Sequence, residues 1–312
     1  MHCVMMRLFN TYRLFTGRWE ERGNEMADKP QDCGGACGSC GVEGCGSRTE
    51  PVSTARRNIK HIIGVVSGKG GVGKSLVCGM LAVELKRRGY RVGILDADLT
   101  GPSIPKMFGL SGVHATAWDN LLMPSETVGG IKIMSANLVL ENETDPVIWR
   151  GPVVAGALQQ FWSQCAWGDL DFLLIDMPPG TSDVALTVFQ SLPIEGIVIV
   201  STPQDLVQMV VGKAVKMAAM MDIPVFGIVE NMSYVECPDC GKRIEPFGPS
   251  KLAETAELYG IDVLGRLPMT GDFARMCDCG AIETALPEDL LPDAVLKIET
   301  VAAFFDDANS TD

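Results

Sequence analysis

The glycine-rich segment Gly68–Ser75 contains the residue types best suited to chemistry. Its eight residues include four glycines and two lysines, and they lie between an apolar run at 62–66 and a segment of helical spacing at 74–89. The spacing fits two phosphate-binding patterns, the Gly-x-Gly-x-x-Gly of dinucleotide sites and the Gly-x4-Gly-Lys-Ser of P-loops. Both patterns place backbone N–H groups and a helix N-terminus on phosphate, so the surrounding elements do not separate them.

Lys74 and Ser75 favour the P-loop. A P-loop needs an amine that reaches the β- and γ-phosphates and a hydroxyl that holds Mg²⁺, whereas a dinucleotide site needs neither. A second apolar segment ends in Asp176 before a Pro-Pro-Gly turn, which suits a residue that senses Mg²⁺ and the γ-phosphate. We therefore predict that the loop binds Mg²⁺-ATP. The predicted contacts are Gly68, Lys69, Gly70, Gly71, Val72, Gly73, Lys74, Ser75 and Asp176.

The order of segments predicts an α/β fold. From residue 58 onward, short β-branched runs alternate with segments of helical spacing, which indicates a buried, mostly parallel sheet flanked by helices. Strands are expected at 62–66, 90–98, 131–135, 171–180, 196–203, 224–231 and 261–268. Helices are expected at 74–89, 151–165, 181–191, 205–221 and 249–259, with another before the acidic end. We predict a P-loop NTPase domain over 58–306 and a disordered end at 307–312.

The cysteine content favours metal binding. Eleven cysteines are present, an odd number, several are closely spaced and no export signal is recognisable. A reducing, cytoplasmic setting is therefore expected, in which clustered cysteines more often bind metal than form disulfides. Cys237-Pro-Asp-Cys240 places two thiolates on one turn, which suits a soft metal. Two ligands do not complete a tetrahedral zinc site, and a redox disulfide is a further alternative.

Residues 1–57 have the composition of a flexible tail. Residues 27–50 are rich in glycine, cysteine and acidic residues and poor in large aliphatic ones, so they cannot form a hydrophobic core unaided. Residues 1–25 look like an extended or misassigned start, with Met26 as the alternative initiator. Four tail cysteines lie within 13 residues and can wrap one [4Fe–4S] cluster or one Zn²⁺. They are Cys33, Cys37, Cys40 and Cys45.

The charge distribution argues against two classes of partner. The net charge is −13, and the acidic excess lies after residue 57. Binding of nucleic acid or of an anionic membrane surface needs positive patches. No apolar run approaches the roughly 18 residues of a membrane span. We therefore expect neither nucleic acid nor membrane as a partner.

Lys69 is not required by an ordinary P-loop. The segment "KGGVGKS" resembles the deviant Walker A motif of the MinD/ParA/nitrogenase-iron-protein class of ATPases, in which the extra lysine reaches the nucleotide of the facing subunit. The resemblance implies a face-to-face homodimer and catalytic roles for Lys69 and Lys74. It also implies that Asp98 positions water or Mg²⁺, that Asp176 holds Mg²⁺ through water, and that Asn231 faces the adenine. For Asp98 the alternative is a helix cap at a strand end.

A more specific resemblance covers about residues 60–268. The chain is similar to the Mrp/ApbC-type iron–sulfur cluster carrier ATPases in six segments that occur in the same order: "GKGGVGKS", "LDADLTGPSIP", "LLIDMPPGTSD", "STPQD", "GIVENMSY" and "CPDC". The resemblance implies one α/β domain that dimerises, with Cys237 and Cys240 of two subunits ligating one bridging [4Fe–4S] cluster. It further implies slow ATP hydrolysis and transfer of the cluster to apo-proteins, with cluster-assembly proteins as further partners.

The other cysteines differ in how well they fit this resemblance. The tail resembles the cluster-binding tail of the family's longer, eukaryotic-cytosolic-type members, and Cys33 fits that pattern less well than the other three tail cysteines. Cys277 and Cys279 stay unassigned. A zinc-binding structural ATPase remains an alternative, as does a nitrogenase-iron-protein-like reductase, although the switch segments "LTGPS" and "MPPGTSD" contain no cysteine. A MinD-like spatial organiser would need a basic amphipathic C-terminal helix, whereas "LKIETVAAFFDDANSTD" is acidic.

Overall fold

The structure is a computed structural model that describes residues 57–98, 101, 103–118, 121–139, 151–180, 183–204 and 207–309. These residues belong to one compact unit, Ser53–Asp312. The tail over 1–57 lies outside the described residues except for its last residue. The tail cysteines predicted to bind metal, Cys33, Cys37, Cys40 and Cys45, therefore lie outside them as well.

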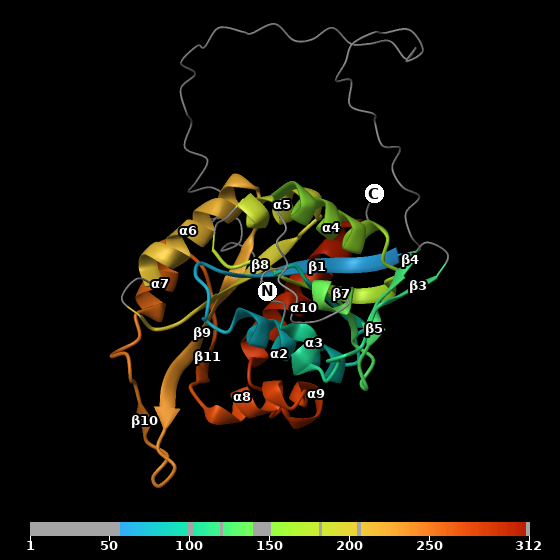
Figure 1. The fold of residues 1–312 in the computed structure, drawn as a ribbon. Coiled ribbons are helices and arrows are strands. Elements are labelled where there is room, and N and C mark those ends of the chain that lie inside the picture. The colour runs from blue at the N-terminus through green and yellow to red at the C-terminus, as the bar shows by residue number, and fades with distance from the viewer. Residues whose placement is uncertain are drawn as a thin grey trace, which may run out of the picture. The chain divides into compact units, whose positions relative to one another are not determined.

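A nine-stranded sheet forms the centre of the described part of the chain (Figure 1). Its order is β10-β9-β8-β1-β7-β2-β6-β5, and β11 also pairs with β9. The central pairs and the β11–β9 pair are parallel, whereas β5 and β10 pair antiparallel with their neighbours. The strands are β1 Arg57–Ser67, β2 Val92–Asp96, β5 Ser125–Glu126, β6 Lys132–Met134, β7 Gly168–Asp176, β8 Gly196–Ser201, β9 Val225–Glu236, β10 Arg243–Ile244 and β11 Val263–Pro268.

Helices cover both faces of this sheet. Successive residues of β1 point to opposite faces: Ile63 and Val65 join the core that contains α2 and α10, and Ile62 and Val66 join the core that contains α4 to α7. Figure 1 shows α4, α5 and α6 on one side of the strands and α2 and α3 on the other. The helices are α2 Lys74–Arg87, α3 Ile104–Met107, α4 Gly151–Ser163, α5 Asp183–Ser191, α6 Val207–Met220, α7 Leu252–Tyr259, α8 Gly271–Asp278, α9 Ile282–Ala285 and α10 Pro292–Asn309.

The predicted fold class is confirmed, and the differences lie at element ends and in short elements. β9 continues to Glu236, well past the expected end at 231, because a hairpin with β10 extends it. α10 reaches Asn309 and so includes residues 307–309 of the segment predicted to be disordered. The hairpin of β3 (Thr116–Trp118) and β4 (Leu121–Met123) was not predicted, because exposed β3 lacks an apolar alternation. No described helix is long and apolar enough to cross a membrane.

His61 on β1 joins three parts of the fold. Its buried ring lies with Nδ1 3.0 Å from Glu195 Oε2, just before β8, and with Nε2 3.5 Å from Asp306 Oδ1 on α10. Burial lowers the pKa of the imidazole, but the two carboxylates raise it, and the net shift is upward from 6.5. In its protonated form, the ring pairs with both carboxylates and so holds α10 and the α5–β8 connection against β1.

We expect His61 to make stability fall with rising pH. Because its folded-state pKa is raised, its stabilising contribution is complete below the unfolded pKa and is lost as pH rises through the folded pKa. The free energy of unfolding, from urea titrations between about pH 5 and pH 9, should decline over that range more steeply in the wild type than in His61→Gln. His114→Gln is the control and should keep the wild-type slope. Equal slopes in wild type and His61→Gln would contradict this role.

Candidate nucleotide site and thiolate hairpin

The P-loop connects the end of β1 to the start of α2. Gly71 and Gly73 have φ values of 78° and 80°, a left-handed conformation that favours glycine. Gly73 is the N-cap of α2, and it has no side chain that could cap the first backbone N–H groups of the helix. Such groups and the positive end of the helix dipole attract phosphate.

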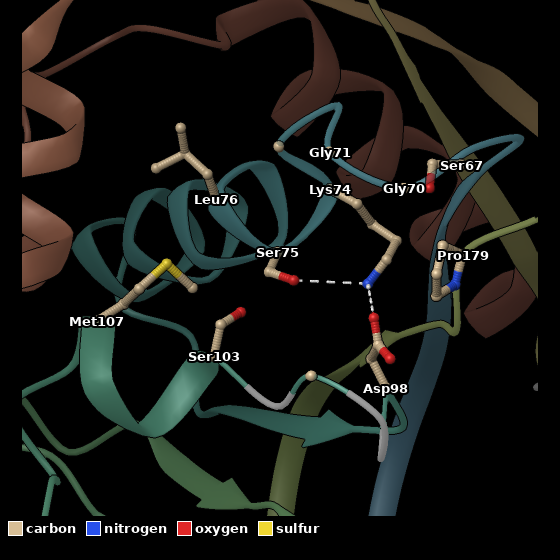
Figure 2. A pocket seen from close by; sticks show the side chains of 12 residues that line it. Ser67, Gly70, Gly71, Lys74, Ser75, Leu76, Asp98, Ser103, Met107 and Pro179 are labelled. Atoms are coloured by element: carbon tan, nitrogen blue, oxygen red, sulfur yellow. Dashed lines mark hydrogen bonds and ion pairs between the residues drawn. The ribbon is translucent and has the colours of Figure 1, made fainter. Parts of the chain in front are cut away.

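A cavity of about 340 Å³ lies beside this loop (Figure 2). The carboxyl ends of β1, β2 and β7 meet at this edge of the sheet, which is where parallel α/β sheets bind ligands. The cavity takes residues from the P-loop and α2, from the segment between β2 and α3, and from the turn after β7. The lining residues are Ser67, Gly70, Gly71, Gly73, Lys74, Ser75, Leu76, Asp98, Gly101, Ser103, Met107 and Pro179.

Lys74, Ser75 and Asp176 form the polar centre of the site. Lys74 Nζ donates to Asp176 Oδ1 at 2.5 Å, and Ser75 Oγ donates to Asp176 Oδ2 at 2.5 Å. Lys74 Nζ is also 3.8 Å from Asp98 Oδ2, an ion pair that is drawn as a dashed line in Figure 2. Burial raises the pKa of the fully buried Asp176, and the Lys74 ammonium opposes that rise. A hydroxyl beside a carboxylate is an oxygen donor set that suits Mg²⁺.

Asp96 is a structural neighbour of the site. It is fully buried and does not line the cavity. Ser135 Oγ donates to its Oδ2 at 3.1 Å, and the Asp98 N–H donates to its Oδ1 at 3.2 Å. Burial and the nearby Asp176 carboxylate raise the pKa of Asp96 well above its ordinary value. Asp96 therefore holds the backbone of Asp98, and Asp98 is the carboxylate that reaches the cavity.

Five predicted nucleotide contacts do not line the cavity: Gly68, Lys69, Val72, Asp176 and Asn231. Lys69 Nζ donates to Gln204 Oε1 in the segment after β8, and the Lys69 carbonyl accepts from Ser67 Oγ at 3.0 Å. Buried Asn231 donates from Nδ2 to the Val72 carbonyl at 2.9 Å and so supports the P-loop backbone. Its contact with adenine stays a prediction. Gln204 was not predicted, although it lies in "STPQD", one of the segments that carry the family resemblance.

Cys237 and Cys240 lie on the turn that joins β9 to β10. The Cys237 N–H donates to the Lys242 carbonyl at 3.0 Å, and the Gly241 N–H donates to the Cys237 carbonyl at 2.8 Å. Cys240 is exposed and Cys237 is partly exposed. The backbone N–H groups of Asp239 and Cys240 donate to the Cys237 sulfur and lower its pKa, with help from the Cys240 side chain. This hairpin therefore exposes a cysteine whose surroundings favour the thiolate form.

One chain contributes two thiolates at this place. Among the described residues, no group of three or more histidine, cysteine or acidic side chains is arranged to hold a metal ion. Cys78 and Cys165 are fully buried, and burial raises the pKa of both thiols, that of Cys165 to about 12. Cys277 is partly buried and Cys279 is exposed at the end of α8. Positions i and i+2 of a helix face different directions, so this pair does not converge.

Fold and site together define a class. The P-loop with its lysine follows the first strand of a mostly parallel sheet. An acidic residue at the end of β7 contacts the lysine and the serine of this loop. This is the arrangement of a P-loop NTPase. A family model described as "ParA: NUBPL iron-transfer P-loop NTPase" matches residues 58–301. The chain belongs to this family.

Similar proteins agree with this assignment. The iron-sulfur cluster carrier protein of Clostridium perfringens is 47% identical over 281 residues, which cover 84% of this chain and 99% of that protein. A nucleotide-binding protein from Archaeoglobus fulgidus, solved in complex with ADP and with Co, is 45% identical, with a TM-score of 0.67 over 74% of this chain and 92% of that chain. The cell division ATPase MinD of Pyrococcus furiosus, 21% identical with a TM-score of 0.57 over 78% and 99% of the two chains, shares the fold. The predicted resemblance to iron–sulfur carrier ATPases is confirmed.

The thiol environments predict unequal reactivity. The pKa of Cys237 is lowered by the N–H groups that point at its sulfur, whereas that of Cys277 is raised, chiefly by burial. Because the thiolate is the nucleophile, iodoacetamide should alkylate Cys237 at a lower pH than Cys277. Mass spectrometry of each cysteine peptide across a pH series measures both midpoints. A Cys237 midpoint equal to or above that of Cys277 would exclude the proposed N–H···S stabilisation.

Proposed function

We propose that this protein is a cytoplasmic, ATP-hydrolysing carrier of iron–sulfur clusters. It receives a [4Fe–4S] cluster as cargo on Cys237 and Cys240 of two subunits and passes it to apo-proteins. The observation that carries the proposal is the hairpin, whose turn places Cys237 and Cys240 together at the surface of a P-loop NTPase fold, with backbone N–H groups that lower the pKa of Cys237. The names of the similar proteins support the same cargo.

The nucleotide site suits Mg²⁺-ATP. The N–H groups of the loop and Lys74 would hold the β- and γ-phosphates, and Ser75 with Asp176 would hold Mg²⁺, whose charge neutralises the phosphates. Lys74 is bound to Asp176, so a phosphate competes with that carboxylate for the ammonium. The contact between Lys74 and Asp176, at the end of β7, would therefore change when nucleotide binds. Asp98, which reaches the cavity, would orient the attacking water.

Lys69 supports a dimer in which each subunit completes the other's site. Its ammonium turns to Gln204 and does not line the cavity of its own chain. A cation supplied by a partner stabilises charge on the transferred phosphoryl group, as an arginine finger does. Hydrolysis would then be slow in a single chain and would follow association. The same association brings together the four thiolates that a cubane cluster requires.

A zinc-binding structural ATPase is the second candidate. The same N–H···S geometry and the Cys-Pro-Asp-Cys spacing suit Zn²⁺, which also takes four thiolates. A nitrogenase-iron-protein-like reductase is less well supported, because Cys237 and Cys240 follow β9, whereas Asp98 follows β2 and Asp176 ends β7. Metal content separates the candidates.

Anaerobic reconstitution tests the cargo. After reconstitution with iron and sulfide, the full chain should bind about four iron and four sulfide per dimer at the hairpin, beyond any metal on the tail. A variant with all four tail cysteines changed to serine isolates this signal. In that background Cys237→Ser/Cys240→Ser should lose iron and sulfide, and Cys277→Ser/Cys279→Ser, the matched control, should keep them. Stoichiometric zinc without sulfide, or an intact cluster in the Cys237/Cys240 variant, would overturn the assignment.

Lys69→Ala should separate binding from hydrolysis. We expect ATP turnover to fall by about 10³-fold, the lower range for a transition-state cation supplied in trans. Nucleotide affinity should stay close to that of the wild type, because Lys69 does not line the cavity. Phosphate release and titration with a fluorescent ATP analogue measure the two effects. Lys213→Ala, on the exposed side of α6, is the control; normal turnover in Lys69→Ala would reject the role in trans.

A further inference from the structure

Glu230 is a buried carboxylate in the middle of β9. Its side chain is 1% exposed. It accepts hydrogen bonds from Arg266 Nε at 3.2 Å, from Ser250 Oγ at 2.8 Å and from Ser233 Oγ. A carboxylate removed from water is costly unless it is paired and hydrogen-bonded. These partners are therefore strongly constrained to stay around it.

The partners of Glu230 connect β9 to the return arm of the hairpin that carries Cys237 and Cys240. Arg266 lies opposite Glu230 in the register of β11 with β9. Its Nη2 donates to Glu245 Oε1 at 2.8 Å, and Glu245 directly follows β10. Ser250 lies at the end of the same excursion, just before α7. The planar guanidinium thus bridges a strand of the sheet to the return arm of the hairpin, a double contact that a lysine cannot reproduce.

The next residue of β9 holds the nucleotide loop. Asn231 donates to the Val72 carbonyl at 2.9 Å, and a Cβ added to Gly73 would lie 2.1 Å from Asn231 Nδ2. Met232 follows with a φ of 56°, in the left-handed region that non-glycine residues rarely adopt. Such a conformation persists where the surroundings determine it strongly. Two adjacent residues of β9 therefore contact different parts of the fold: Asn231 contacts the P-loop, and Glu230 contacts Arg266, which binds the return arm of the hairpin.

We propose that the Glu230–Arg266–Glu245 bridge couples the nucleotide loop to the thiolates of Cys237 and Cys240, with Arg266 and Glu245 as positioning residues. This inference rests on the proposed function. Movement of the Val72 carbonyl on nucleotide binding shifts Asn231 and the β9 backbone. Because Arg266 ties Glu245 to Glu230, the return arm of the hairpin moves with β9. Without that tie, the return arm is joined to β9 only through the short pairing of Arg243 and Ile244, and the thiolates respond less to nucleotide.

Thiol reactivity in the cluster-free, full-length chain tests the coupling. Alkylation rates of Cys237 and Cys240 are measured peptide by peptide, with and without a non-hydrolysable ATP analogue, and Cys279 is the internal reference. In the wild type we expect the analogue to change the rates by about fivefold or more, the lower end of ordinary coupling between sites. Glu245→Gln should reduce that change to near unity while leaving the affinity for the analogue unchanged.

Glu236→Gln is the matched control. It removes the same charge from the same hairpin, but Glu236 pairs with Arg243 within the hairpin and not with Arg266. It should keep the wild-type response. Arg266→Lys retains a cation near Glu230 without the double contact, so it should fold, as thermal unfolding will show, and respond like Glu245→Gln. A wild-type chain whose thiols ignore the analogue, or a Glu245→Gln chain that responds fully, would overturn the coupling.

The outcome is separable from the proposed function. Alkylation needs no cluster, so a chain that binds no iron can still show or lack the nucleotide response. Conversely, the wild type can bind the cluster while the Glu245→Gln variant keeps the full effect of nucleotide on alkylation. That result would refute the bridge and leave the carrier function standing.

Discussion

The buried carboxylate of Asp176 is the interaction around which the nucleotide site is organised. It has no exposure to solvent, and its oxygens accept from Lys74 and Ser75 at the first turn of α2. Because a buried charge without partners is far costlier than a paired one, the end of β7 and the start of α2 must stay together. That requirement fixes the direction of α2 and holds the glycine loop between it and β1.

Much of this could be predicted from the sequence. The P-loop and its partner Asp176 were identifiable because the chemistry demands those residue types in a strict local spacing. The strands were identifiable because β-branched runs buried on both faces stand out from the intervening helices. The contacts of Lys69 with Gln204, of Asn231 with Val72 and of Glu230 with Arg266 were not predictable. They join positions far apart in the chain, and the sequence around one residue does not specify which distant side chain will contact it.

β9 shows why the end of an element can matter more than its existence. A strand was expected there and was found, but the expected end at 231 divided the strand from the cysteines. The apolar pattern breaks at Glu230 and Asn231, two polar residues that are buried because they have partners elsewhere in the fold. The periodicity of apolar residues predicts which apolar side chains are buried. It does not predict polar residues that are buried because they are hydrogen-bonded. The continuous strand contains Asn231, which contacts the nucleotide loop, and leads directly into the turn that carries Cys237 and Cys240.

The short strand β10 has a consequence for association. It ends the order of the sheet with only Arg243 and Ile244 paired to β9, so the open edge offers few backbone groups for another strand to pair with. Edges of this kind resist uncontrolled strand addition. The guanidinium of Arg243 lies 4.2 Å from the centre of the Tyr234 ring, which adds a charge to the same edge. The thiolates are thus displayed at a margin of the sheet that discourages aggregation, which suits a protein whose reactive group must stay accessible to other proteins.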